Sequence, residues 1–144
     1  VGLEVQDVDL QERSVTIKPN SIRGLKTKGS HRTLPLSHRA AETLQEHRKG
    51  KEDGEAIFPN YARPRGNDAA SAMLMKRLRT VITDKKLTMH SLRHRMKDKL
   101  RNTGCPEAIS MAILGHGSNT VAANYNSGYA LDVMREHMEK VWRE

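Results

Sequence analysis

The spacing of hydrophobic residues changes at about residue 36 of the chain. Before that point, residues 14–18 alternate in character and end at Pro19, and residues 32–36 form a second short run with hydrophobic positions. Both segments predict β-strands, and the polar, glycine-containing segment between them predicts a connecting loop. After residue 36 the hydrophobic residues recur every three or four positions, which predicts helices.

Capping residues divide the first part of this helical region. Ser37 is expected to cap a helix that ends near Gly50, and residues 50–67 predict a loop because they are polar and contain glycine and proline. Asp68 is expected to cap the next helix. Four hydrophobic residues share one face of that helix: Leu74, Leu78, Val81 and Ile82.

The helical pattern is most informative over residues 89–103. One stripe, which we expect to bury this helix, holds four hydrophobic residues: Met89, Leu92, Met96 and Leu100. A second arc gathers five basic or imidazole side chains: His90, Arg93, His94, Lys97 and Arg101. Gly104 is expected to end this helix, and Pro106 is expected to open the next at its first position. That helix stops at Gly115, so His116 follows a helix end from which a side chain can point into a cleft.

Two further helices are expected near the C-terminus. Asn119 or Thr120 would cap a short helix that carries Tyr125. The final helix covers residues 130–143 and has a hydrophobic stripe made of Leu131, Met134, Met138 and Val141. Such a stripe requires a partner surface, which is either the chain's own domain or a neighbouring protomer. The whole pattern predicts an α+β, mainly α-helical fold, with a small antiparallel sheet on the N-terminal side followed by a helical bundle.

Composition limits the classes of protein to consider. A chain of 144 residues suits one domain, and no apolar run is long enough to span a membrane. The absence of a signal peptide or lipidation motif favours the cytoplasm. The single cysteine, Cys105, excludes a disulfide framework and a cysteine-based zinc site. The net charge of +8 makes a polyanionic partner, nucleic acid first, the first interpretation to test, and an ordinary basic surface accounts for the charge equally well.

Each candidate residue also has a structural interpretation. His90 and His94 have the spacing of metal ligands, but the segment lacks the glutamate of the zinc-protease helix and a third ligand, so we predict no metal site. A basic arc is usually a solvated helix face. His116 and Tyr125, taken singly, are compatible with structural roles.

The order of these residues is more specific. His90-x-x-Arg93, then Leu114-Gly115-His116, then Tyr125 nine residues after His116, resembles the tyrosine recombinase (phage integrase) catalytic domain. Residues 3–10 are similar to the first strand segment of that family, and residues 26–36 are similar to its lysine-bearing β-hairpin.

The resemblance implies DNA cleavage and rejoining through a 3′-phosphotyrosine intermediate, with neither metal nor cofactor. Tyr125 would be the nucleophile, in preference to Tyr129. Three side chains would contact the phosphoryl oxygens, namely Arg93, His90 and His116, and His90 would also help to deprotonate the nucleophile. Lys26, or alternatively Lys28, would protonate the leaving 5′-oxygen.

The resemblance also implies partners and a domain boundary. Double-stranded DNA would be contacted by Lys28, Arg32, Lys97 and Arg101, within a synapse of four protomers encoded by a mobile element. Residues 1–144 would form the C-terminal part of the catalytic domain, with a core-binding domain and a further catalytic arginine upstream of Val1. The competing interpretations are a type IB topoisomerase-like strand transferase and a non-catalytic DNA-binding module.

Overall fold

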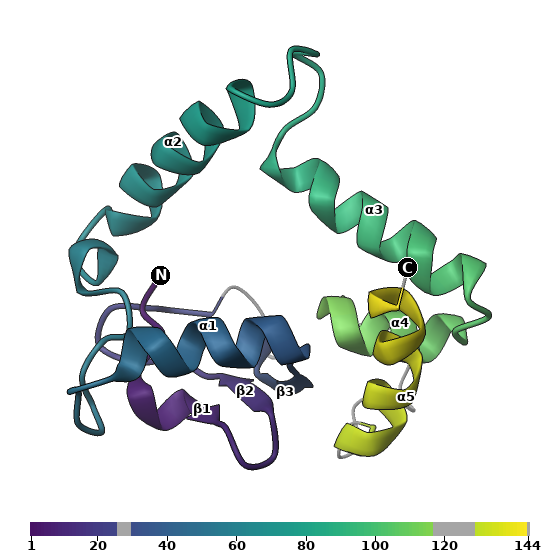
Figure 1. Cartoon of the computed structure of the whole chain (residues 1–144), viewed down its shortest axis with the longest axis horizontal. Helices are drawn as coiled ribbons and strands as arrows, with labels where there is room; N and C mark the ends of the chain where they lie inside the picture. Colours follow the sequence, from purple (N-terminus) through teal and green to yellow (C-terminus); the bar gives the residue numbers. More distant parts are fainter. Residues whose placement is uncertain (26–29, 117–128, 144) are drawn as a thin grey trace.

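The structure is a computed structural model of the chain that describes residues 1–25, 30–116 and 129–143. A 3-10 turn, η1 (Val5–Asp7), leads into an antiparallel sheet of three strands in the order β1-β2-β3 (Figure 1). The strands are β1 (Val8–Asp9), β2 (Ser14–Ile17) and β3 (Arg32–Pro35). The two predicted strands are therefore confirmed to within one residue at their ends.

A first hydrophobic core lies between the sheet and helix α1 (His38–Arg48). The hydroxyl of Ser37 accepts a hydrogen bond from the Ala40 N–H at 3.2 Å, which confirms the predicted helix cap. The buried residues of this core come from η1, the sheet, α1 and the following loop, and they are Val5, Val8, Leu36, Ala41 and Ile57.

A second core joins helices α3 (Met89–Asn102), α4 (Glu107–Leu114) and α5 (Leu131–Trp142). Its buried members are Leu100, Cys105, Ile109, Ile113, Met134, Met138 and Val141. The predicted stripe of the last helix is thus buried within its own domain. Leu34 of β3 packs against this core while Leu36, two residues later, lies in the first core. The segment containing β3 therefore links the two halves of the molecule.

Helix α2 (Gly66–Arg79) differs from its prediction at both ends. It begins two residues before Asp68, after the 3-10 turn η3 (Pro59–Tyr61), and Arg65 rather than Asp68 occupies the cap position. Gly66 permits this start, because a Cβ at that position would collide with the Tyr61 carbonyl oxygen.

At its C-terminal end α2 stops at Arg79, so Val81 and Ile82 lie outside the helix. Arg79 explains the early stop, since its guanidinium donates hydrogen bonds to the carbonyls of Asp84, Lys85 and Leu87 and holds the connection in a turn. Val81 is consequently 79% exposed.

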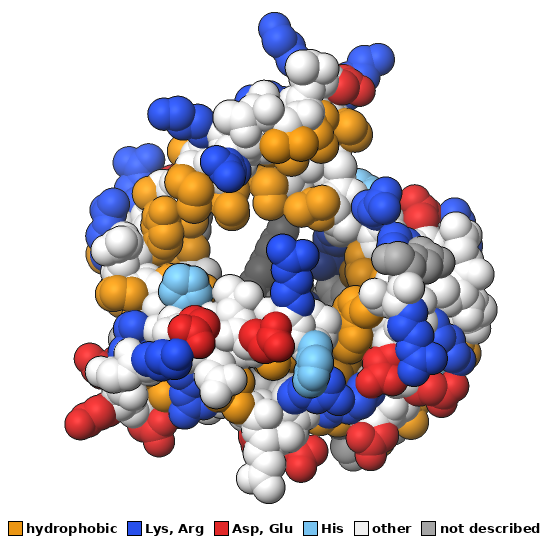
Figure 2. All heavy atoms as spheres, in the orientation of Figure 1, with side chains coloured by type: hydrophobic (Ala, Val, Ile, Leu, Met, Phe, Trp, Pro, Cys, Tyr) orange, Lys and Arg blue, Asp and Glu red, His pale blue; other side chains and the backbone are white. Residues whose placement is uncertain are grey.

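The hydrophobic stripe of α3 is buried only in its C-terminal half, which corrects the prediction that it buries the whole helix. Leu100 is inaccessible to solvent and Met96 packs beside it, whereas Leu92 is 52% exposed. The reason is geometric: the core formed with α4 and α5 includes Met96 and Leu100, and the N-terminal half of α3 instead extends towards α2 (Figure 1). Hydrophobic side chains line the inner edge of the arch that results (Figure 2). No helix among the described residues is long and apolar enough to cross a membrane.

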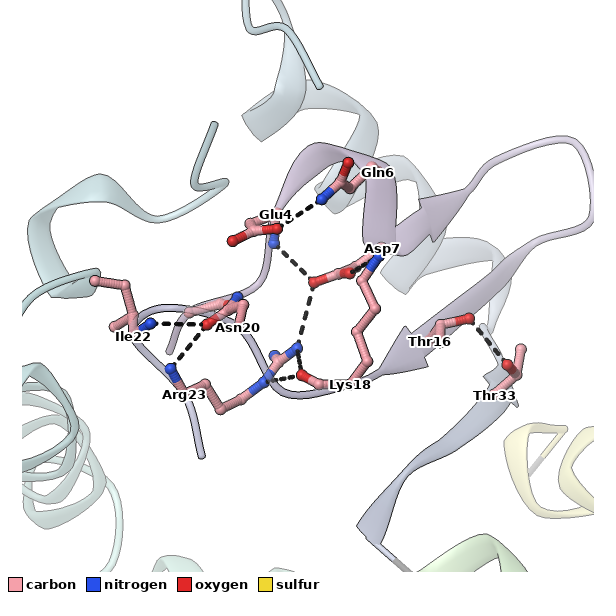
Figure 3. Close-up of polar contacts among 10 residues, drawn as sticks. Glu4, Gln6, Asp7, Thr16, Lys18, Asn20, Ile22, Arg23 and Thr33 are labelled. Atoms are coloured by element: carbon pink, nitrogen blue, oxygen red, sulfur yellow. Dashed lines mark hydrogen bonds and ion pairs between the residues drawn. The ribbon is translucent and has the colours of Figure 1, made fainter. Parts of the chain in front are cut away.

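A buried carboxylate organises the segment that follows β2 (Figure 3). The Asp7 side chain is fully buried and forms ion pairs of 3.3 Å with Lys18 Nζ and with Arg23 Nη2. Its Oδ2 atom also accepts a hydrogen bond from the Glu4 N–H. The Asn20 side chain accepts hydrogen bonds from the N–H groups of residues 22 and 23. We call Asp7, Lys18 and Arg23 the Asp7 cluster.

Candidate functional site

The C-terminal end of α4 provides the framework of the site. Gly115 adopts a left-handed conformation with φ of 67° and ends the helix, as predicted. The Gly115 N–H donates to the Ala112 carbonyl at 3.1 Å, and the His116 N–H donates to the Met111 carbonyl at 2.9 Å. These bonds fix the backbone of His116, whose side chain is exposed.

Two arginines from other elements contact this helix end. Arg93 of α3 donates from Nη2 to the Leu114 carbonyl at 2.5 Å. Arg32 of β3 donates from Nε to the Ile113 carbonyl at 3.3 Å, and from Nη1 to the Ser30 carbonyl at 3.0 Å. A Cβ at Gly115 would collide with Arg32 Nη1, so glycine is required both for the backbone turn and for the approach of this guanidinium.

The charges of this region influence one another. Burial, and then the positive charge of Arg93, lower the pKa of Arg32. The pKa of His116 lies below its usual value because of desolvation, followed by the charges of Arg93, Lys97 and Arg32. We call Arg32, Arg93, Lys97 and His116 the α4-end cluster.

The α4-end cluster has no acidic counterpart within the described part of the chain. No carboxylate there forms an ion pair with any of its four members, and the side chains of Arg32 and Arg93 donate to backbone carbonyls. Of the residues that the structure does not describe, 26–29 and 117–128 contain neither aspartate nor glutamate, and Glu144 is the acidic one. Positive charge gathered without a counter-charge suits an anionic ligand.

The other predicted residues of α3 lie along the same arc of the helix. His90 is exposed, and its ring contacts His94 edge-on, with 4.9 Å between the ring centroids. Lys97 and Arg101 are exposed, and Arg101 pairs with Asp98 at 2.9 Å. Within the described residues, no group of three His, Cys, Asp or Glu side chains is placed to hold a metal ion.

Three predicted site residues lie outside the described residues, namely Lys26, Lys28 and Tyr125. Tyr129 is described and is 38% exposed just before α5. The contact of Arg32 with the end of α4 is not among the features predicted from the sequence. The alternation of side chains along the strand could have predicted it. Arg32 lies two residues before Leu34 and therefore on the same face of β3. That face packs against the core of α3, α4 and α5.

The sequence of the chain is similar to those of known proteins. The chain is 28% identical over 134 residues to a protein described as tyrosine recombinase XerC from Roseiflexus castenholzii, and the match covers 87% of this chain and 40% of that protein. The chain thus spans less than half the length of this relative. No solved structure matches the chain. The family model described as the phage integrase family matches residues 1–130, and the chain belongs to that family.

Proposed function

We propose that this chain is the C-terminal part of a catalytic domain that cuts and rejoins DNA strands in site-specific recombination. The observation that carries this proposal is the convergence of Arg93 and His116 in a cluster that has cations but no carboxylate. Family membership and the similarity to a tyrosine recombinase support it. Three further residues supply groups that the chemistry needs, namely His90, Tyr125 and Lys26, or alternatively Lys28 in place of Lys26.

The reaction begins with attack of the Tyr125 hydroxyl oxygen on the scissile phosphorus. The tyrosine loses its proton with help from His90, a new O–P bond forms, and the bond from phosphorus to the 5′-oxygen breaks. Lys26, or alternatively Lys28, protonates that 5′-oxygen as it leaves. A 5′-hydroxyl of another strand then attacks the 3′-phosphotyrosine and restores the tyrosine, so no external energy source is required.

The cations act on the charge that develops at phosphorus. Arg93 presents a planar guanidinium that can bind two phosphoryl oxygens, and His116 can donate a third hydrogen bond. In the free structure Arg93 donates to the Leu114 carbonyl, next to the turn that carries His116. Removing one donor of this kind typically lowers the rate by about 10²–10³-fold.

Exposed basic residues supply the remaining contacts to double-stranded DNA. Lys97 and Arg101 lie one turn apart on the face of α3 that carries Arg93. Together with Lys28 they contact backbone phosphates, which fix the position of the duplex without reading its sequence. In the full-length protein four protomers assemble on two DNA sites.

The test is a nicked suicide duplex, from which the cleaved end diffuses away so that the covalent intermediate accumulates. The full-length protein is expected to give an adduct on a denaturing gel. Tyr125→Phe abolishes the adduct, while the matched variant Tyr129→Phe retains it. An adduct that persists in Tyr125→Phe contradicts the proposed nucleophile. Absence of any adduct, with duplex binding retained, favours a non-catalytic DNA-binding module.

Two controls sharpen this experiment. The 144-residue chain alone is expected to form the adduct far more slowly, because the arginine that we place upstream of Val1 and the core-binding domain would be missing. A supercoil-relaxation assay without paired sites separates the recombinase from a topoisomerase, since strand exchange needs two duplexes. Efficient relaxation without recombination favours the topoisomerase.

A further inference from the structure

Arg32 connects two segments that are far apart in the sequence. Its guanidinium donates to the Ile113 carbonyl in the last turn of α4, 81 residues away, and to the Ser30 carbonyl beside β3. The same group lies against Gly115, where a Cβ would collide with Nη1. Arg32 is also half-buried, in contrast to the exposed Lys97 and Arg101. These contacts distinguish it from a surface phosphate contact.

The electrostatics of the helix end explain why a cation is stable there. The C-terminus of a helix carries a partial negative charge equivalent to about half an elementary charge, and its last carbonyls lack helical partners. Arg32 and Arg93 satisfy two consecutive carbonyls, those of Ile113 and Leu114. Two guanidinium charges exceed the charge of the helix end, so the region keeps a positive surplus that faces His116.

We infer that Arg32 is a positioning residue that holds the Gly115–His116 turn against β3, so that His116 and Arg93 face the same phosphate. This inference rests on the proposed function of the site. Arg32 itself makes no direct contact with DNA in this arrangement. An arginine is needed because its rigid fork reaches two carbonyls at once, whereas the single ammonium of a lysine is a point charge.

The first test follows the turn in the absence of DNA. In Arg32→Met we expect faster hydrogen exchange at the N–H groups of Gly115 and His116, and a higher pKa for the His116 imidazole in an NMR titration. The pKa rises because one of the charges that lower it has been removed. Arg39→Met, an exposed site on α1, is the matched control and changes neither quantity.

The second test measures the binding of a DNA duplex as a function of salt. Each phosphate contact contributes about 0.9 to the slope of log affinity against log salt concentration. Lys97→Met is expected to lower the magnitude of this slope by about 0.9, the contribution of one phosphate contact. Arg32→Met is expected to weaken binding while leaving the slope unchanged, because it acts through His116 and Arg93.

The outcomes decide between the two roles of Arg32. A slope that falls in Arg32→Met as much as in Lys97→Met, with the exchange and titration of the turn unaltered, overturns the inference and makes Arg32 a phosphate contact. Failure of every form to bind duplex contradicts the proposed function, while the DNA-free titration still tests Arg32. If Arg32→Met does not fold, Arg32→Lys replaces it. That variant keeps the charge, so faster exchange at Gly115 with little change in the His116 pKa supports the inference, and unchanged exchange overturns it.

Discussion

The Asp7 cluster and the α4-end cluster both gather cationic side chains, but only the first contains a carboxylate. In the Asp7 cluster, Lys18 and Arg23 form ion pairs with a fully buried aspartate (Figure 3). In the α4-end cluster, Arg32 and Arg93 contact only carbonyl groups within the described part of the chain. Similar residue types therefore occur in two different electrostatic situations.

The difference indicates different roles. A cation that is paired with a buried carboxylate is neutralised and contributes to holding the chain in place. Burial lowers the pKa values of Arg32 and His116, and the neighbouring cations, which have no counter-charge in the described part of the chain, lower them further. Folding leaves this charge unbalanced, and a bound phosphate would balance it. We therefore propose that the Asp7 cluster has a structural role and that the α4-end cluster binds a ligand.

The largest expected effect is on stability and comes from breaking the balanced cluster. Asp7→Asn removes the carboxylate from two cations whose side chains are 36% and 17% exposed. We expect the free energy of unfolding to fall by about 3 kcal/mol, near the lower end for a broken buried pair, because both cations retain access to water. Urea denaturation measures this loss. The exposed variant Asp53→Asn is the control, and an equal effect at both sites contradicts the structural role of Asp7.

The next effect comes from balancing the α4-end cluster with a ligand. A DNA duplex at one hundred times its dissociation constant is expected to raise the free energy of unfolding by about 2.7 kcal/mol. Arg93→Met should lose most of this stabilisation, since it removes the charge that contacts the helix end. Arg95→Met, which removes an exposed arginine from another face of α3, should keep it. Thermal melts with duplex measure this stabilisation. If Arg93→Met and Arg95→Met lose it equally, duplex binding depends only on the total charge of the protein.

A smaller effect on the free energy of unfolding is expected from alanine substitutions at two helix ends, one with backbone strain alone and one with added steric crowding. Gly104 and Gly115 both have positive φ, of 76° and 67°, but only at Gly115 would an added methyl group meet a guanidinium. Gly104→Ala is expected to cost about 1 kcal/mol, the cost of the left-handed conformation. Gly115→Ala should cost about 2 kcal/mol, because Arg32 must also move. It should weaken duplex binding as well, and equal effects of the two variants on binding contradict the account.

The smallest effect is a dependence of DNA affinity on pH. The pKa of His116 is lowered in the free protein, so the ring is mostly neutral at pH 7. A bound phosphate stabilises the imidazolium and raises that pKa, so binding takes up a proton and becomes tighter as pH falls between the bound and free pKa values. We expect a gain of a few-fold, flattened in His116→Asn and kept in His47→Asn, as measured by fluorescence anisotropy. Weaker binding at lower pH would contradict this assignment.

The sequence predicted local features well where one residue type decides the outcome. Ser37 caps α1 and Gly115 ends α4 as expected, since each depends on contacts within a few residues. Periodicity also identified the stripes of α3 and α5, but it did not show which parts are covered. Met138 is buried and Leu92 is exposed, because burial depends on whether a helix distant in the sequence packs against that position.

Side-chain partners across the fold were harder to predict. The order of His90, Arg93 and His116 indicated the family, yet the position of Arg32 against Gly115 depends on how β3 meets α4. The early end of α2 depends on carbonyls in the following turn that Arg79 contacts. In both cases an arginine forms contacts that no local pattern of hydrophobic residues specifies.

The most direct test of the central claim compares the two clusters in one NMR titration with a short DNA duplex. The signals to follow are the arginine Nε–Hε groups and the His116 imidazole. We expect saturable shifts at Arg93 and His116, with Arg23 of the Asp7 cluster unchanged because its charge is already paired. Shifts at Arg23 equal to those at Arg93, or no shift at Arg93 and His116 while the duplex binds, would contradict this claim.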